Sequence, residues 1–224
     1  MNLYAEYSLH AQLKEALSGP GDRFEVVVNG KVVDLVKADG ELVEVQTRNL
    51  GAIVPKVLAL AAAGRKVRVV HPVAAELRIG RLDPSTGEIS GTRRSPKKGD
   101  IYSLFDELVR APSLIAARNV SIEAVLVRVT EYRLRDGSGS WWRRGDRTTD
   151  RVLEQILERR RFRTRRDWLA LIQRTASPPY DSLSLGEKLG ISPFRARKVL
   201  YCLSRARLLV ETGRNGRRKV YERA

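Results

Sequence analysis

The sequence predicts an α/β protein in two parts, a mixed β-sheet flanked by helices and a smaller, mostly helical C-terminal module. Three observations support this prediction. Hydrophobic patterns in the first 71 residues follow the order helix, three strands, helix, strand. A Gly/Ser-rich stretch at residues 136–140 is typical of a flexible joint. Most of the excess positive charge follows this joint.

The composition restricts the class of protein. The chain has 224 residues, of which 42% are hydrophobic and 30% charged, so it can bury a core. The longest apolar run, residues 57–63, is far shorter than the roughly 18 residues that span a bilayer. The N-terminus shows no secretion signal, and one cysteine with two histidines excludes a disulfide framework and a zinc finger. We therefore expect a cytoplasmic protein with no membrane partner.

The formal net charge of +16 is unevenly distributed. Basic residues exceed acidic ones by one in residues 1–70, by two in 71–136 and by thirteen in 137–224. Such a local excess indicates a polyanionic partner, and nucleic acid is the first candidate. Arginine-rich surfaces also occur in proteins that bind no nucleic acid, so the charge alone does not identify the partner.

Turn residues divide the first part of the chain into elements. Gly19-Pro20-Gly21 ends the first helix, Asn29-Gly30 is a strong hairpin signal, and Gly64 ends the second helix. The expected elements are a helix at residues 2–18, strands at 24–28, 32–36 and 42–47, a helix at 51–63 and a strand at 67–70.

Acidic residues inside these apolar elements are candidates for chemistry. Alternation places Glu44 and Gln46 on one face of their strand. A two-residue turn before this strand would send Asp34 and Glu44 to opposite faces, whereas a three-residue loop with left-handed Gly40 would pair them. Two adjacent carboxylates are costly unless a positive group lies between them. Glu6 shares the leucine stripe of the first helix and should face the sheet.

Three carboxylates on one side of a sheet form an oxygen-rich site that suits Mg²⁺ or Mn²⁺. Such an ion can stabilise phosphoryl oxygens and make a bound water nucleophilic. The alternative is that Asp34 and Glu44 are solvent-facing residues of a half-exposed sheet.

Asp34, then Glu44-Val45-Gln46 on the following strand, with Glu6 on the preceding helix, resembles the PD-(D/E)XK nuclease superfamily. The resemblance includes the order of helices and strands and implies a restriction-endonuclease-like sheet. It implies that Asp34 and Glu44 ligate a catalytic Mg²⁺ or Mn²⁺, that the Val45 carbonyl completes the metal shell, and that Glu6 assists. Gln46 stands where lysine is usual, so it brings no positive charge to the attacking water. Members of this superfamily often cut both strands as dimers, which makes a homodimer one expected state.

Basic residues follow the acidic motif. Arg48 and Lys56 lie at the start of the second helix, where a phosphate next to the metal would be well placed. A loop at residues 91–99 carries four more cations that could clamp a DNA backbone. The alternative is that these residues are only solvated surface groups.

The C-terminal part is predicted to hold helices at residues 149–161, 164–174, 184–189 and 193–206, then a basic hairpin at 209–221. Ser192 and Pro193 indicate the start of the longest helix. The short helix, glycine turn, capped basic helix and hairpin resemble a winged helix-turn-helix domain, although winged helices also serve as protein-interaction modules. The resemblance implies DNA contacts by Arg195, Lys198 and Arg205 of the recognition helix and by Arg214, Arg217 and Arg218 of the wing.

These inferences combine into one prediction. The expected domains are a nuclease-like domain at residues 1–136 (core 3–71, elaboration 72–136), a linker at 137–148 and a winged helix at 149–224. The predicted function is a metal-dependent DNA endonuclease that hydrolyses phosphodiester bonds, with Gln46 orienting the water. The alternative is a catalytically inactive DNA-binding regulator or repair accessory protein, and RNA is a weaker substrate candidate.

Overall fold

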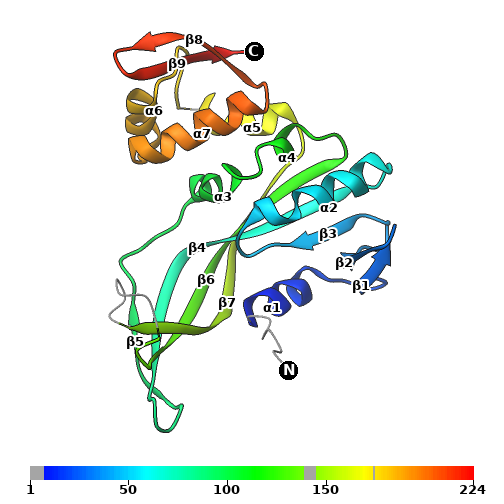
Figure 1. The fold of residues 1–224 in the computed structure, drawn as a ribbon, viewed down its shortest axis with the longest axis vertical. Coiled ribbons are helices and arrows are strands. Elements are labelled where there is room, and N and C mark those ends of the chain that lie inside the picture. The colour runs from blue at the N-terminus through cyan, green and yellow to red at the C-terminus, as the bar shows by residue number, and fades with distance from the viewer. Residues whose placement is uncertain (1–7, 139–144, 174) are drawn as a thin grey trace.

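The computed structural model describes residues 8–138, 145–173 and 175–224. A mixed sheet of seven strands forms its centre, with helices on both faces, and a helical region with a two-stranded sheet lies at one end (Figure 1). The predicted α/β class with a mixed, helix-flanked sheet is confirmed. Among the described residues, no helix is long and apolar enough to cross a membrane.

The first part of the chain has the predicted order of elements. They are α1 (Ser8–Leu17), β1 (Arg23–Val28), β2 (Lys31–Val36), β3 (Leu42–Val45), α2 (Leu50–Ala62) and β4 (Val67–Leu82). β1, β2 and β3 pair antiparallel, and β3 pairs parallel with β4 because α2 carries the chain across. The leucines of α1 pack on one face of the sheet, and the apolar side chains of α2 pack on the other.

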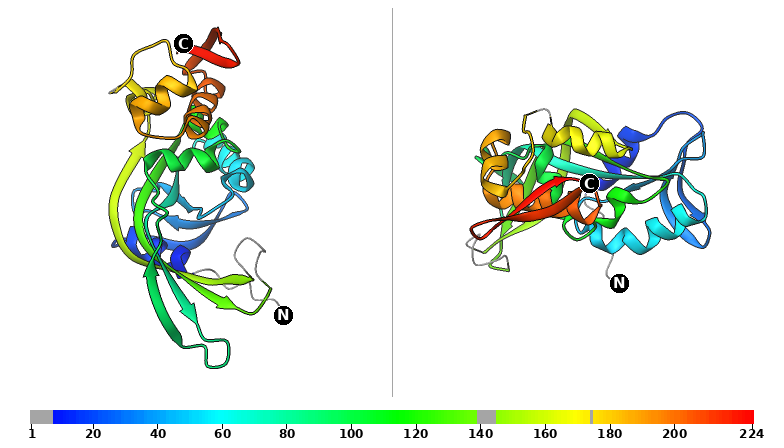
Figure 2. Two further views of the ribbon diagram at one scale, coloured as in Figure 1. Left: turned by 90° about the vertical axis from the view of Figure 1, so that its left-hand side faces the viewer. Right: turned by 90° about the horizontal axis from the view of Figure 1, so that it is seen from above.

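The central strands are longer than predicted. β4 is 16 residues long and continues through Pro72. It pairs parallel with β6 (Val120–Arg135) along almost its whole length. After Leu82 the chain turns back, and β5 (Ile89–Arg94) pairs antiparallel with β4. The far ends of these strands extend beyond the helices as a curved arm (Figure 2). The local pattern breaks at Pro72, but the partner strand β6 continues the ladder past it.

The largest correction concerns residues 149–161, which were predicted as a helix. They belong to β7 (Asp146–Phe162), which pairs antiparallel with β6 from Ile122↔Phe162 to Arg135↔Asp146. Charge pairs across the two strands, such as Arg159–Glu123, favour the strand over the helix. Residues 146–162 therefore complete the large sheet. The predicted linker overlaps the β6–β7 connection, whose residues 139–144 lie outside the described part.

The remaining elements pack together near one end of the sheet. They are η1 (Ile101–Leu104), α3 (Phe105–Leu108), α4 (Ser113–Ala116), α5 (Arg165–Gln173), α6 (Ser182–Leu189), α7 (Pro193–Arg205), β8 (Leu209–Asn215) and β9 (Arg218–Arg223). Trp168 of α5 stacks on Phe162 at a ring distance of 4.3 Å and meets Phe105 edge-on at 6.1 Å. The large sheet and the C-terminal helices therefore share one continuous core.

Turn and cap residues start and stop the C-terminal helices, at Ser192, Pro193 and Gly190 as predicted and at Asp181 in addition. The Ser192 side chain accepts a hydrogen bond from the Arg195 amide at the start of α7, and Pro193 occupies the first turn. Asp181 caps α6, and Gly190 ends it with a left-handed backbone (φ 66°). β8 and β9 form the two-stranded sheet that follows.

Candidate functional site

The β2–β3 hairpin brings two of the predicted acids together. Leu35 pairs with Val43 around a three-residue loop in which Gly40 has a φ of 83°. Of the two registers that the sequence left open, the structure has the one with the three-residue loop. Asp34 and Glu44 are the next residues after the Leu35–Val43 pair, and they lie close enough for the charge of Asp34 to act on Glu44.

Asp34 is held as an ionised carboxylate. Its side chain is 21% exposed, and its Oδ2 accepts a hydrogen bond of 2.8 Å from the Val45 amide and lies 3.4 Å from His10 Nε2. Burial by itself would raise the pKa of Asp34, but His10 and the Val45 amide outweigh burial and hold the pKa below its usual value. The segment that carries Glu44 therefore also orients Asp34.

Glu44 has the opposite electrostatic balance. Its side chain is only 4% exposed, and its Oε1 lies 2.6 Å from Lys56 Nζ of α2. Burial raises the pKa of Glu44 and the nearby Asp34 charge adds to this, while Lys56 opposes it. Within the described residues Oε1 has no partner with hydrogen-bond geometry, so the Lys56 contact compensates its charge. The basic side chains that face the two acids are therefore Lys56 and His10.

The other predicted residues of the motif take different places. Gln46 follows β3, and its side-chain amide donates a hydrogen bond of 2.6 Å to the Arg48 carbonyl. The main-chain carbonyl of Gln46 lies 2.7 Å from His71 Nδ1. The Val45 side chain is buried among the leucines of α1. Glu6 lies outside the described residues. The side chain of Gln46 is thus engaged in the turn that leads from β3 to α2.

Two site residues were not singled out from the sequence in these roles. His10 stands on α1, and Lys56, which was predicted as a DNA contact, stands on the opposite side of the sheet in α2. The spacing of His10 on the sheet-facing stripe of α1 was a usable signal. Nothing in the local sequence linked Lys56 to Glu44, because their contact depends on how α2 packs on the sheet.

The two carboxylates suit a cation that binds only a few protein ligands. Among the described residues, no group of three or more His, Cys, Asp or Glu side chains is placed to hold a metal ion. Asp34 and Glu44 form a pair, and Glu44 Oε1 is a buried oxygen without a hydrogen bond. Mg²⁺ usually keeps several waters and binds only one or two protein carboxylates. The two acids therefore fit such an ion without a third side chain.

The predicted recognition residues of α7 fall into two groups. Arg195 and Lys198 contact the Asp106 carboxylate of α3 at 3.2 and 2.7 Å, so they join α7 to the rest of the molecule. Cys202, which the spacing placed on the same basic face, is fully buried. Arg205 is exposed as predicted. α3 therefore covers part of the face that carries the predicted DNA contacts Arg195 and Lys198, and their role in DNA binding stays a prediction.

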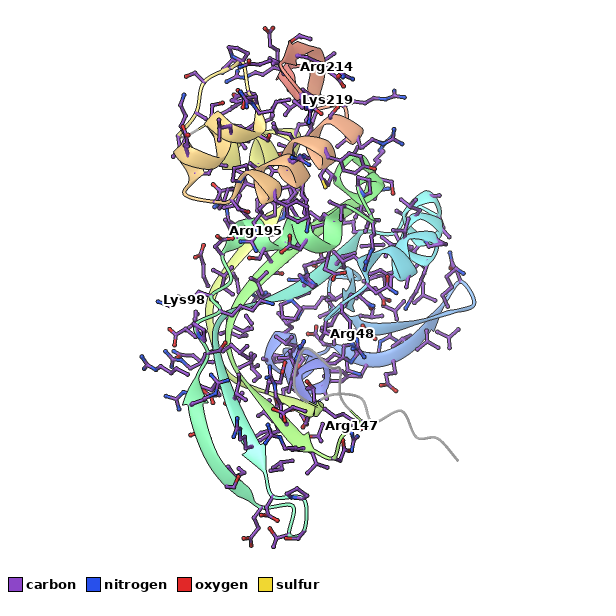
Figure 3. The ribbon with its side chains drawn as sticks, turned by 60° about the vertical axis from the view of Figure 1, so that its left-hand side comes forward. Arg48, Lys98, Arg147, Arg195, Arg214 and Lys219 are labelled. Carbon is purple, nitrogen blue, oxygen red and sulfur yellow. The ribbon has the colours of Figure 1, made fainter. Side chains whose placement is uncertain are left out.

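The cations of the β8–β9 hairpin are more open. Arg214 and Arg217 are exposed, and Arg218 Nε lies 3.4 Å from Asp181 of α6. Figure 3 shows Arg214 at the end of the molecule farthest from Arg147. Two of the three predicted wing residues are therefore available to a partner.

An exposed stripe on α7 was missed. Phe194 and Tyr201 are 62% and 44% exposed, and Arg197 and Arg205 lie between and after them at helical spacing. Lys198 Nζ lies 4.6 Å from the centre of the Phe194 ring. Alternating aromatic and arginine residues at three- and four-residue intervals were the signal in the sequence.

Comparison with known proteins identifies the family. Residues 7–163 match the model of a family described as a domain of unknown function, DUF8091. This chain belongs to the DUF8091 family. The match ends directly after β7, so the DUF8091 region comprises the large sheet and its helices, and the C-terminal helices and hairpin follow it.

A relative is known from Treponema pallidum (strain Nichols). That protein, named only as uncharacterized, is 32% identical to this DUF8091 protein over 165 residues. The aligned part is 74% of this chain and 65% of the relative, so the chain spans less than two thirds of that protein's length. No solved structure matches the chain.

Proposed function

We propose that this DUF8091 protein is a metal-dependent nuclease that hydrolyses phosphodiester bonds in DNA. The observation that carries the proposal is the proximity of Asp34 on β2 to Glu44 on β3, within a unit of helix, three strands, helix and strand. Both carboxylates are largely buried, and each has a cationic or basic side chain against it. Such a pair is costly to bury and has no role in packing.

The acid pair would hold Mg²⁺ or Mn²⁺ together with the main-chain carbonyl of Val45. When bound, the ion supplies charge neutralisation at a phosphate and a water of lowered pKa. The ionised state of Asp34 favours this binding, and Oε1 of Glu44, whose present contact is Lys56 at 2.6 Å, would be the second carboxylate ligand. Glu44, whose pKa is raised, binds a cation only after it loses its proton.

In this proposal Lys56 supplies the positive charge that the lysine usual at the position of Gln46 would provide. Gln46 is neutral and its amide is bonded to the Arg48 carbonyl, so it supplies no cation. The Lys56 ammonium already touches Glu44, and it is 27% exposed and mobile enough to turn toward a phosphate bound beside that acid. His10 keeps the carboxylate of Asp34 oriented.

The C-terminal region would hold the DNA. Residues 163–224 contain fifteen basic and five acidic residues, a net charge of +10. The order α6, Gly190, α7, β8–β9 supports a winged-helix arrangement, with Arg205, Arg214 and Arg217 exposed on it. Such cations provide the sequence-independent part of DNA affinity.

The test is a plasmid cleavage assay with Mg²⁺ or Mn²⁺. Asp34→Asn and Glu44→Gln should each lower the cleavage rate by about two orders of magnitude or more, because each removes a charge needed at the reacting phosphate. Glu15→Gln, an exposed acid on α1, is the matched control and should cleave like the wild type. Unchanged cleavage in both site variants would refute the proposed site.

A DNA-binding regulator or accessory protein without cleavage is the second candidate. The ion pair of Lys56 with Glu44 favours it, because a cation of the protein already neutralises the acid. This candidate expects tight DNA binding, no cleavage with any divalent ion, and no effect of Asp34→Asn on binding.

A further inference from the structure

A pocket of about 350 Å³ adjoins the segments that carry the acid pair. It lies between the β4–β6 strand pair, the loop at residues 95–99, α3 and the start of α7. Leu9 and Thr47 in its wall directly adjoin His10 and Gln46 in the chain. A volume of this order is that of a small-molecule site. Neither the acid pair nor the C-terminal cations account for this pocket.

The lining of the pocket is positively charged. Three acids, Asp106, Glu107 and Glu131, face six cations, which are Arg48, Lys97, Lys98, Arg133, Arg151 and Arg195. Figure 3 shows Arg48, Lys98 and Arg195 around this region, on three separate parts of the chain. The formal excess of three positive charges favours an anionic ligand.

The acids of the lining are already engaged. The Glu131 carboxylate pairs with Arg133 and Arg151 at 2.7 and 2.8 Å, and Asp106 pairs with Arg195 and Lys198. Within the described part of the chain, Lys97 and Lys98 form no ion pair. Arg195 Nε is buried and finds no hydrogen-bond partner among the residues that the structure describes, which is an unusual and costly state for a donor. The unused donors in the wall are therefore cationic.

The pocket also has an apolar wall. Its lining residues from β4 and β6 are Pro72, Val73, Ala74, Leu77, Val127 and Val129. A purely ionic ligand such as inorganic phosphate would leave this wall in contact with water. A ligand that combines an anion with a flat apolar ring would cover both.

His71 adds a hydrogen-bond acceptor to the pocket. It is 6% exposed, and burial holds its pKa below the usual value, so the ring is neutral at pH 7. Its Nδ1 lies 2.7 Å from the Gln46 carbonyl, which can only accept, so Nδ1 carries the proton. The remaining nitrogen, Nε2, is an acceptor that an N–H group of a ligand can use.

We propose that this pocket binds one nucleotide of a nucleic-acid strand. Lys97 and Lys98 contact its phosphate, the base lies against the β4–β6 wall, and a base N–H donates to His71 Nε2. The inference deepens the proposed function and rests on it in one respect, since the rest of the strand would pass the acid pair. The nucleotide pocket, unlike the exposed cations of the hairpin, selects a base as well as a phosphate.

The test measures binding of deoxyadenosine monophosphate to the full chain by calorimetry without divalent metal, beside inorganic phosphate and deoxyadenosine. The monophosphate should bind most tightly, and the double variant Lys97→Ala/Lys98→Ala should weaken it by on the order of tenfold or more, because two charged donors are lost. The matched control is Arg23→Ala/Lys66→Ala, which removes two exposed cations outside the pocket lining and should bind the monophosphate normally. Ala74→Phe, which fills the pocket, should also abolish binding, with a thermal melt to show that it folds.

Each outcome decides one of the two proposals. Binding of the monophosphate no tighter than phosphate, or unaffected by the two lysines, overturns the nucleotide pocket even if the wild type cleaves DNA. Lysine-dependent binding of the monophosphate without cleavage under any metal keeps the pocket and overturns the nuclease. Cleavage together with lysine-dependent binding supports both.

Discussion

The large sheet and the C-terminal region use their charges differently. Residues 1–162 have a net charge of +6, and residues 163–224, little more than a quarter of the chain, have +10. In the sheet, carboxylates such as Glu44, Glu123 and Glu131 are buried and each has a cationic partner. In the C-terminal region, Arg205, Arg214 and Arg217 point to solvent. Paired buried charges restrain structure or chemistry, whereas unpaired exposed charges of one sign attract a polyanion.

The largest expected effect is on stability, and it separates the two regions. Glu123 is 3% exposed and pairs with Arg68 at 3.0 Å and Arg159 at 2.6 Å. Glu123→Ala should lower the free energy of unfolding by about 3 kcal/mol, because it removes a buried acid that pairs with two arginines and leaves Glu41, at 3.1 Å, as the remaining acid beside buried Arg68. Glu211→Ala, which breaks the exposed pair with Lys219, should cost less than about 1 kcal/mol. Urea denaturation measures both, and similar losses would remove the contrast between the regions.

The second effect is on DNA binding. The triple variant Arg205→Ala/Arg214→Ala/Arg217→Ala should lower DNA affinity and reduce the slope of log K against log salt by about 2 to 3, because up to three phosphate contacts are lost. Point variants are needed because truncation after β7 would expose the shared core around Trp168.

The control for this measurement comes from the large sheet region. The variant Arg23→Ala/Lys66→Ala/Arg118→Ala removes three exposed cations there and should leave both affinity and slope nearly unchanged. An equal loss in the two triple variants would show that DNA binds by overall charge, and not through the C-terminal region.

A smaller effect is expected where the two regions meet. Asp106 holds Arg195 and Lys198 of α7, and its side chain is 39% exposed. Asp106→Ala should destabilise the protein by about 1 kcal/mol or less. It should raise DNA affinity by several fold, since two cations lose their internal partner. Fluorescence anisotropy with a short duplex measures this, and an unchanged affinity would show that this face of α7 does not reach DNA.

The smallest expected effect is on stability at different pH, where the ionisation of Asp34 and of Glu44 should act in opposite directions. The pKa of Asp34 is lowered in the folded protein, so its ionisation stabilises the fold above the unfolded pKa near 3.8, and this is lost as pH falls. The pKa of Glu44 is raised, so its ionisation opposes folding above about 4.5. At pH 7, Asp34→Asn should therefore destabilise the protein and Glu44→Gln should stabilise it. Thermal melts at pH 7 and pH 4 should show both differences shrinking at the lower pH, and effects of the same sign would contradict this assignment.

Predictability from sequence differed between the parts of the candidate site. The proximity of Asp34 to Glu44 followed from a local rule, because the three-residue loop with Gly40 sets the register of its hairpin. The contact between Lys198 and Asp106 could not be predicted from a local rule, since these residues lie 92 positions apart. The same holds for the pocket, whose lining comes from segments spread over most of the chain.

Local sequence was enough to predict the hairpins, the capped start of α7 at Ser192, the mixed sheet and the two acids within it. Three features depend on the packed fold: residues 146–162 form a strand, Lys56 neutralises Glu44, and part of α7 faces α3. Turn chemistry and capping act within a few residues of the chain. Cross-strand pairing and charge compensation join distant segments, so they are settled only when the sheet and its helices have packed.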